Sequence, residues 1–177
     1  MEAERVTAST TIEAAPEAVF AMLTDPSAHA DIDGTGWVRG SLDGDRITAA
    51  GQVFRMAMYD ENHPDKDYKD YKDYKVANRV EVFDEPRAIA SQPGTESPET
   101  GELSFGGWIW RYDLESIGPS RTTVTLTYDW SAVPPYVREY LISHRSGPTT
   151  STTPWNTCPT SSPRLGAVIS GHPPAFW

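Results

Sequence analysis

The stretch that decides the fold is residues 6–26, VTASTTIEAAPEAVFAMLTDP, where the side-chain pattern changes from that of a strand to that of a helix. Residues 6–12 alternate and are rich in Thr and β-branched side chains, which predicts a strand. Pro16 fits the first turn of a helix, because its missing N–H would be unpaired there in any case. From Pro16 to Leu23 the apolar residues fall on one helical stripe, and the following Asp-Pro pair ends the helix. A strand therefore leads through a proline into a short helix.

Beyond this stretch, the pattern predicts one more helical turn, a series of strands and a last helix. Residues 27–31 favour the helical turn, and residues 136–142 follow a proline pair that is typical of a helix start. Between them the apolar residues recur with a period of two, which is typical of an antiparallel sheet with one wet face. This order predicts an α+β fold. The expected strands are residues 37–42, 46–59, 76–83, 87–92, 102–117 and 121–131, with a hairpin turn at 43–45 and a polar loop at 94–101.

Composition and charge narrow the function classes. The chain has 177 residues, with 15 basic and 25 acidic side chains and a net charge of −10. A field of that sign repels phosphate backbones, so we expect no nucleic acid partner. No apolar run approaches the roughly 20 residues of a membrane span, and the first residues lack the features of a signal peptide. With Cys158 as the single cysteine, we expect a cytoplasmic protein without an internal disulfide.

Residues 67–75 repeat Asp-Tyr-Lys three times without variation. A period of three fits neither a strand nor a helix. If two copies were removed, the remaining copy would lead directly into the strand predicted at 76–83. We interpret the repeat as a tandem duplication or an engineered, epitope-like insert in a solvated hairpin loop. A Tyr- and Lys-based recognition loop is the functional alternative.

The C-terminal part differs in composition from the rest, so we divide the chain into one domain over residues 1–143 and an irregular tail over residues 144–177. Residues 147–163 are almost entirely Thr, Ser and Pro, which is typical of linkers or disordered regions. With G/C-rich codons, a frame that starts at the third base of the His144 codon can instead encode leucines at helical spacing. We hypothesise that the tail is out of frame, through a mutation or a sequencing error, and that the C-terminal helix is truncated.

His29, Asp31 and Asp33 are the first candidates for chemistry. Their spacing matches only the start of a calcium loop, because Leu42 stands where such a loop needs a bidentate Glu. A non-haem iron triad would need a second His, so we expect no metal. Two roles stay open. The residues form Asx-type turns that end a helix, or His29 or Asp31 acts as an acid, base or gate at the mouth of a pocket.

An aromatic and methionine-rich stripe is the second candidate, because alternation places its side chains on one face of the sheet. It is either ordinary core or the lining of a ligand cavity. Trp and Tyr carry polar tips that need partners when buried, and pockets are commonly lined by aromatic residues with a few polar groups. A polar Asn78 on the face of three valines is either satisfied by its neighbours or turned to a ligand. The predicted ligand-binding residues are His29, Phe54, Met56, Met58, Asn78, Trp108, Trp110, Tyr112, Tyr128 and Trp130.

Two stretches resemble a known family. Residues 10–26, TTIEAAPEAVFAMLTDP, resemble the opening of the START-like, or SRPBCC, superfamily, and within it the bacterial polyketide cyclase/dehydrase-like proteins. Residues 121–131, followed by Val133-Pro134-Pro135, resemble the last strand and the start of the C-terminal helix of these proteins. The resemblance covers about residues 5–143 and implies a helix-grip fold, in which a curved antiparallel sheet wraps a C-terminal helix with a hydrophobic cavity between them. It also implies that no cofactor is needed.

On this basis we expect a protein that binds a small hydrophobic molecule, such as a lipid or a polyketide-like compound, between the sheet and the C-terminal helix. The sequence has neither a phosphate-binding glycine loop nor a Gly-x-Ser-x-Gly elbow. A protein-interaction module of the same fold, such as a chaperone activator, remains one alternative. The other is a cyclase or dehydratase that works by acid–base chemistry in the same cavity, with His29, Asp31, Asn78, Tyr112 and Tyr128 as its candidates.

Overall fold

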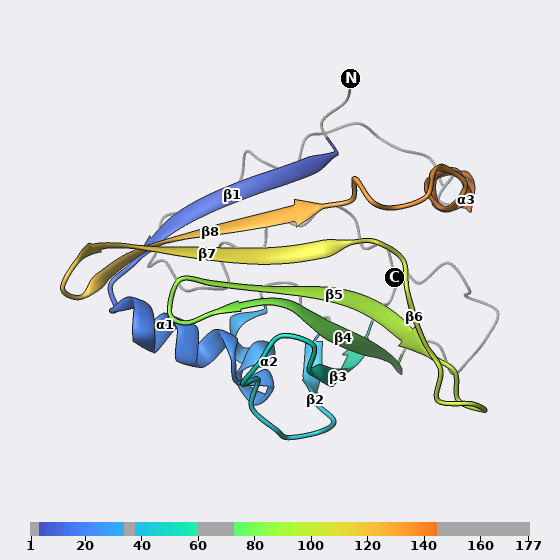
Figure 1. Ribbon diagram of the computed structural model, residues 1–177, viewed down its shortest axis with the longest axis horizontal. Coiled ribbons are helices and arrows are strands. Elements are labelled where there is room, and N and C mark those ends of the chain that lie inside the picture. The colour runs from blue at the N-terminus through green and yellow to red at the C-terminus, as the bar shows by residue number, and fades with distance from the viewer. Residues whose placement is uncertain (1–3, 34–37, 60–72, 145–177) are drawn as a thin grey trace.

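A computed structural model describes residues 4–33, 38–59 and 73–144 of the chain. The described backbone forms a curved antiparallel sheet, with short helices under one part of it and a separate helix at the other end (Figure 1). The elements are β1 (Arg5–Ile12), α1 (Pro16–Leu23), the 3-10 helix η1 (Pro26–Ala28), α2 (His29–Ile32), β2 (Val38–Ser41), β3 (Val53–Tyr59), β4 (Asp73–Asp84), β5 (Ala88–Glu96), β6 (Leu103–Phe105), β7 (Ile109–Gly118), β8 (Arg121–Asp129) and α3 (Pro135–His144).

The strand–proline–helix prediction is confirmed at the N-terminus. Pro16 stands at the start of α1, after Ala15 in an extended conformation. The stripe on α1 buries Phe20 and Leu23 against the sheet. The helix ends where the Thr24 hydroxyl donates a hydrogen bond to the Phe20 carbonyl oxygen at 2.9 Å. Two short helical turns, η1 and α2, then follow in place of the one that the sequence predicts.

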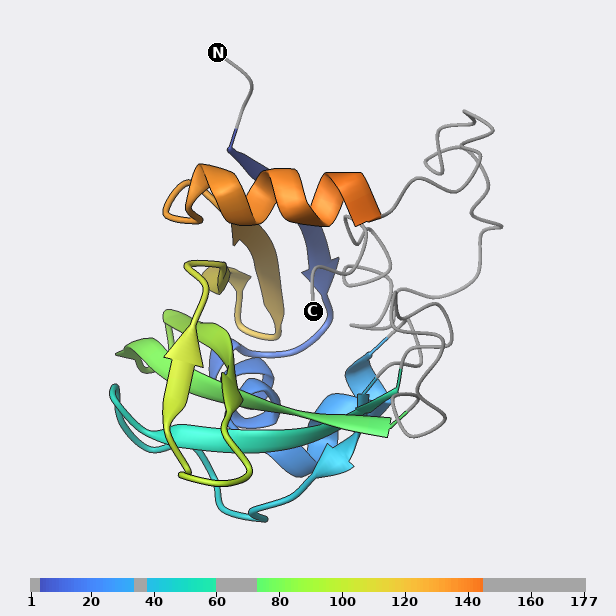
Figure 2. The same cartoon turned by 90° about the vertical axis from the view of Figure 1, so that its right-hand side faces the viewer.

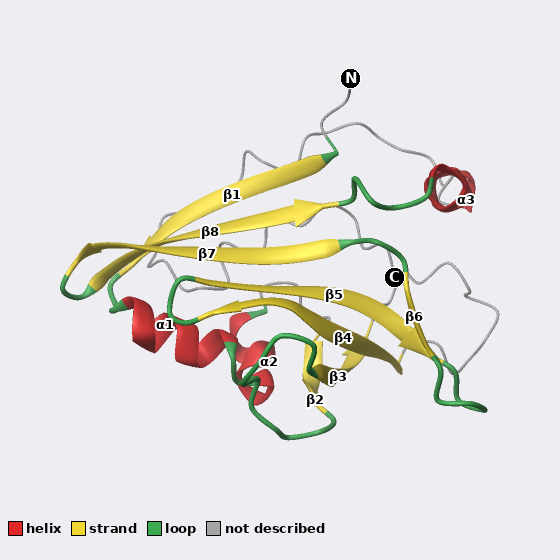
Figure 3. Ribbon diagram, in the orientation of Figure 1, coloured by secondary structure: helices red, strands yellow, loops and turns green. Residues whose placement is uncertain are grey.

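The sheet runs in the order β1-β8-β7-β5-β4-β3-β2, with β6 paired to the outer part of β5. Every pair of neighbouring strands is antiparallel, as the alternating pattern predicts. The sheet curves so that β1 and β8 turn away from β3 and β4 (Figure 2). Helices α1 and α2 lie together on one side of the sheet, whereas α3 stands apart at the far end (Figure 3). This is a curved-sheet α+β architecture, consistent with the helix-grip fold that we expected, except that α3 stands apart from the sheet.

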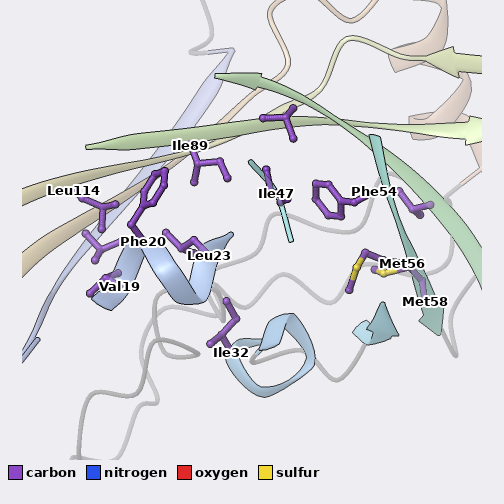
Figure 4. Close-up of a cluster of buried hydrophobic side chains, with 13 residues drawn as sticks. Val19, Phe20, Leu23, Ile32, Ile47, Phe54, Met56, Met58, Ile89 and Leu114 are labelled. Carbon is purple, nitrogen blue, oxygen red and sulfur yellow. The ribbon is translucent and has the colours of Figure 1, made fainter. Parts of the chain in front are cut away.

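The core lies between the sheet and the two N-terminal helices, α1 and α2 (Figure 4). Cross-strand pairs place Tyr112 opposite Leu126 and Leu114 opposite Val124, so that alternate residues of β7 and β8 share the face that α1 covers. Burial of these side chains is the main force that holds α1 on the sheet. The buried cluster consists of Val19, Phe20, Leu23, Ile32, Ile47, Phe54, Met56, Met58, Val76, Val80, Ile89, Leu114 and Val124.

Two of the predicted strands are shorter than expected. The strand predicted at 102–117 is broken into β6 and β7, because Gly107 has a φ of 95° and the chain turns there. A Cβ atom on Gly107 would lie 2.7 Å from the Ala132 carbonyl oxygen, so only glycine fits. The strand predicted at 46–59 begins at Val53. The preceding residues form a loop, in which the Ile47 N–H donates to the Thr24 carbonyl oxygen at 2.8 Å.

The ends of β4 and β5 also differ from the prediction. The sequence places Val82 on the same face as Asn78, but a register shift lies between Val80 and Val82. Such a bulge adds one residue and changes which side chains face the core. Beyond it, the Phe83 ring packs against the Phe20 ring, with centroids 5.3 Å apart. Strand β5 continues through Glu96, into the stretch that we expected to be a loop.

The third copy of the Asp-Tyr-Lys repeat belongs to a strand. Tyr74 pairs with Met58 and Lys75 pairs with Ala57, so β4 begins within the repeat, and the prediction of a loop is wrong for residues 73–75. The first two copies, residues 67–72, lie outside the described residues. The same holds for residues 145–177 of the tail, on which the proposed reading frame depends.

The predicted C-terminal helix is present as α3, and one arginine connects it to the sheet. The Arg138 guanidinium donates to the carbonyl oxygens of Val133 at 2.8 Å and Ser131 at 3.0 Å, and pairs with Glu4 at 2.6 Å. These contacts join the start of α3 to the end of β8 and to the residue before β1. In the part of the chain that the structure describes, no helix is both long and apolar enough to cross a membrane.

Candidate ligand-binding cavity

A cavity of about 150 Å³ lies between the sheet and the N-terminal helices. Strands β3, β4, β5 and β7 form its walls, and α1, α2 and the start of β2 face them. The described side chains of α3, residues 135–139, do not line it, so it lies elsewhere than between the sheet and the C-terminal helix. The lining residues are Leu23, His29, Ile32, Asp33, Val38, Ile47, Phe54, Met56, Met58, Val76, Asn78, Ile89, Ala90, Ser91, Trp110 and Tyr112.

Strand alternation explains why most of these side chains meet. Phe54, Met56 and Met58 occupy every second position of β3 and are all buried. The register places Phe54 opposite Asn78 on β4, and Ser91 opposite Trp110 on β7. One continuous face of four strands therefore supplies the walls, and its apolar side chains outnumber the polar ones.

Seven of the ten predicted ligand-binding residues line this cavity, and three do not. Trp108 lies in the break between β6 and β7, outside the cavity. The Tyr128 ring packs on Trp110, with centroids 4.3 Å apart, and Trp130 packs on Tyr128 at 5.5 Å. Tyr128 and Trp130 therefore extend the aromatic stripe past Trp110, beyond the end of the cavity. The seven lining residues are His29, Phe54, Met56, Met58, Asn78, Trp110 and Tyr112.

His29 reaches the cavity from α2, with its protonation state set by its surroundings. Its Nε2 lies 2.9 Å from the Leu23 carbonyl oxygen, and because a carbonyl only accepts, Nε2 carries the proton. The ring stands edge-on to Phe54, with centroids 5.7 Å apart. Burial lowers the pKa of His29 below its ordinary value of 6.5. The ring is therefore neutral at pH 7, and Nδ1 is the nitrogen that carries a lone pair.

Asp33 and Tyr112 add a carboxylate and a phenol to the lining. The Val38 N–H donates to Asp33 Oδ2 at 2.9 Å, which ties the end of α2 to the start of β2. Burial raises the pKa of the Tyr112 phenol, and the negative charge of Asp33 raises it further. The phenol therefore keeps its proton at neutral pH and presents an O–H group.

The remaining acid–base candidates have different positions. Asn78 is half-buried in the cavity wall, and its Nδ2 lies 3.5 Å from the Val76 carbonyl oxygen, at the long limit of a hydrogen bond. Asp31 is exposed on α2 and does not line the cavity. Of the five candidates, His29, Asn78 and Tyr112 therefore share one cavity, and Asp31 and Tyr128 lie outside it.

The sequence analysis named Asp33 as a candidate for chemistry but not as a ligand-binding residue, and it did not single out Ser91; both line the cavity. Asp33 follows His29 by four residues, a helical spacing that places two side chains on one face. Ser91 follows Ile89 by two residues on a strand, which is the spacing of a shared face. Both spacings are visible in the sequence. Neither predicts which part of the sheet the helix packs against, and that packing forms the cavity. Among the described residues there is no group of three or more His, Cys, Asp or Glu side chains that could hold a metal ion.

Comparison with known proteins finds relatives without an assigned function. No family model matches the chain. Two uncharacterized proteins of Mycobacterium tuberculosis, MT0096 and Rv0088 from two strains, are each 29% identical over 130 residues. The matched part is 72% of this chain and 48% of each relative. The chain thus spans about half the length of the curated relatives it matches.

Solved structures with a similar backbone come from several bacteria. Protein Ms6760 of Mycobacterium smegmatis has a TM-score of 0.56 at 12% identity, over 81% of both chains. A protein of Arthrobacter aurescens has a TM-score of 0.53 at 13% identity, over 73% of this chain and 70% of its own. A protein of Rhodobacter sphaeroides has a TM-score of 0.52 at 15% identity, over 79% and 80%. At this identity the likeness shows the fold alone.

Proposed function

We propose that this protein binds a small, mostly apolar molecule in the cavity between the sheet and the helices α1 and α2. The observation that carries the proposal is an apolar cavity of about 150 Å³ with a few polar side chains in its lining. Protein cavities of about this volume, lined by Leu, Ile and Phe, bind benzene. The volume therefore favours a ligand about one ring in size over a long acyl chain.

The lining favours an aromatic ligand. Phe54 on β3 and Trp110 and Tyr112 on β7 present three rings, and Met56 and Met58 add polarizable sulfur atoms. Both groups make favourable contacts with aromatic rings. The resemblance of residues 10–26 to polyketide cyclase/dehydrase-like proteins supports a small hydrophobic ligand.

The pKa values and hydrogen bonds of the polar side chains in the cavity favour binding over acid–base catalysis. Efficient proton transfer needs a group with a pKa near the working pH. Burial moves the pKa of Tyr112 away from neutrality, in the direction that keeps the phenol protonated. The His29 Nε2–H group donates a hydrogen bond to the Leu23 carbonyl oxygen, and the Asn78 amide faces the Val76 carbonyl oxygen. Contacts of this kind orient a ligand and hold the wall in place.

The test is to fill the cavity from one wall. Ser91→Leu replaces a half-buried hydroxyl on β5 by a branched apolar side chain, whereas Thr95→Leu makes a similar change on the same strand at an exposed position outside the cavity. Titration calorimetry with benzyl alcohol should show binding to the unchanged protein and to Thr95→Leu. Affinity for Ser91→Leu should fall at least about tenfold, which corresponds to about 1.4 kcal/mol. Equal affinity in all three proteins would place the ligand elsewhere.

A further inference from the structure

We propose that the cavity selects a cationic ligand, a one-ring aromatic amine whose ammonium group lies near the Asp33 carboxylate, and that it discriminates against aromatic carboxylates. This inference rests on the proposed function, because it names the chemical class that the same cavity takes. It concerns charge rather than size, so the two proposals can fail separately.

The charge of the lining is the first argument. Asp33 contributes a carboxylate, and none of the cavity-lining residues that the structure describes is Lys or Arg. His29 is neutral at pH 7 because burial lowers its pKa, so it brings no positive charge. The chain as a whole carries a net charge of −10. The charge of the described lining and the net charge of the chain therefore both favour a cation over an anion.

The position of Asp33 is the second argument. The Val38 N–H holds Oδ2 at 2.9 Å, so the carboxylate is fixed at the junction of α2 and β2. Asp33 and Tyr112 on β7 line the same cavity, and after burial the charge of Asp33 is the second cause that raises the pKa of Tyr112. A charge that acts on a wall residue also acts on a ligand that lies between α2 and that wall.

The hydrogen-bonding groups and the rings are the third argument. His29 uses its N–H on the Leu23 carbonyl oxygen, which leaves Nδ1 with a lone pair that accepts. Asn78 turns Nδ2 toward a backbone carbonyl and has an amide oxygen that accepts. An ammonium group supplies three donors and no acceptor, which complements this set. The faces of Phe54 and Trp110 can add cation–π attraction.

The experiment compares three probes of the same ring size at pH 7: benzylamine, benzyl alcohol and benzoate. An opposite charge within about 4–6 Å shifts a pKa by about 1–3 units, which is a factor of about 10 to 1,000 in binding. Calorimetry on the unchanged protein should therefore show that benzylamine binds at least about tenfold tighter than benzoate, with benzyl alcohol between them.

Two variants identify the carboxylate. Asp33→Asn removes the charge but keeps an oxygen that accepts from the Val38 N–H, and it should reduce the ratio of benzylamine to benzoate affinity by at least about tenfold. Asp31→Asn removes the same charge from an exposed position two residues earlier on α2 and should leave the ratio within about twofold. A thermal unfolding scan of both variants shows whether they fold. If Asp33→Asn does not fold, the ratio of benzylamine to benzoate affinity in the unchanged protein still decides whether the cavity prefers a cation.

The outcomes separate the two proposals. Benzyl alcohol that binds while benzoate equals or exceeds benzylamine would overturn the charge inference and leave the cavity proposal standing. A ratio that both variants change equally would assign the selectivity to the overall charge and overturn the role of Asp33. No binding of any of the three probes to the unchanged protein would contradict the proposed function and the inference together.

Discussion

Helices α1 and α2 cover neighbouring parts of the same sheet, yet one part is solid and the other is hollow. Helix α1 has eight residues and packs against β5, β7 and β8, where Leu114 is buried. Its Phe20 ring also meets the Phe83 ring of β4. Helix α2 has four residues and packs against β2, and the cavity opens between it and β3. A two-turn helix brings enough apolar side chains to fill the space beneath a curved sheet, whereas a single turn does not. The cavity therefore lies where the covering helix is shorter.

The largest expected effect is a loss of stability when a side chain is removed from the solid part of the core, under α1. Phe20 is only 2% exposed, so Phe20→Ala should lower the free energy of unfolding by about 4 kcal/mol, as for other buried Phe residues. Met22→Ala on the same helix is the control, because Met22 is 41% exposed and should change stability by less than about 1 kcal/mol. Urea unfolding measures both. A small loss for Phe20→Ala would mean that α1 is not a stabilising cover.

A matched pair of valines compares the two parts directly. Val124 on β8 is packed in the core, and Val76 on β4 lines the cavity; both are buried strand residues. Removing two methyl groups costs about 1.6 kcal/mol in transfer free energy, and a rigidly packed site adds a penalty for the new void. We expect Val124→Ala to cost about 2.5 kcal/mol and Val76→Ala about 1.5 kcal/mol in urea unfolding. The reverse order would contradict the contrast between a solid and a hollow part.

The smallest expected effect is a pH dependence of the free energy of unfolding, which His29 in the cavity lining causes. Burial lowers the pKa of folded His29 below 6.5, so near pH 6 the unfolded state binds more protons than the folded state. The free energy of unfolding should therefore fall as the pH is lowered through 6.5, with a slope of at most about 1.4 kcal/mol per pH unit. Urea unfolding at several pH values should show this slope, and His29→Gln should remove it while carboxylate titration at lower pH persists. An unchanged slope would assign it to another group.

Prediction from the sequence works where one residue type has one dominant structural effect. Pro16 and the proline pair at 134–135 mark two helix starts, and the alternation along β3 and β8 identifies the buried face. The bulge between Val80 and Val82 leaves no sign in the sequence, because the side chains on both sides of it are valines. The break at Gly107 was missed because glycine also occurs inside strands, and the nearby Ala132 that excludes a Cβ comes from another segment.

The same limit applies to the cavity. Seven lining residues follow from alternation and from the position of His29, since both depend on local spacing. The role of Asp33 depends on α2 packing beside β2, and the exclusion of Tyr128 depends on its ring meeting Trp110. Such tertiary contacts join segments that are distant in the sequence, so spacing within one segment does not predict them.

The entry of the Asp-Tyr-Lys repeat into β4 has a consequence for protein engineering. Whichever copies are deleted, the triplet that precedes Val76 is unchanged, so Tyr74 and Lys75 keep their partners on β3. Deleting one copy shortens the connection between Tyr59 and Asp73 by three residues and changes the entropy of loop closure by only about 0.2 kcal/mol. Adding or deleting whole copies before Asp73 should therefore leave the pairing of Tyr74 and Lys75 with β3, and with it the register of the sheet, unchanged.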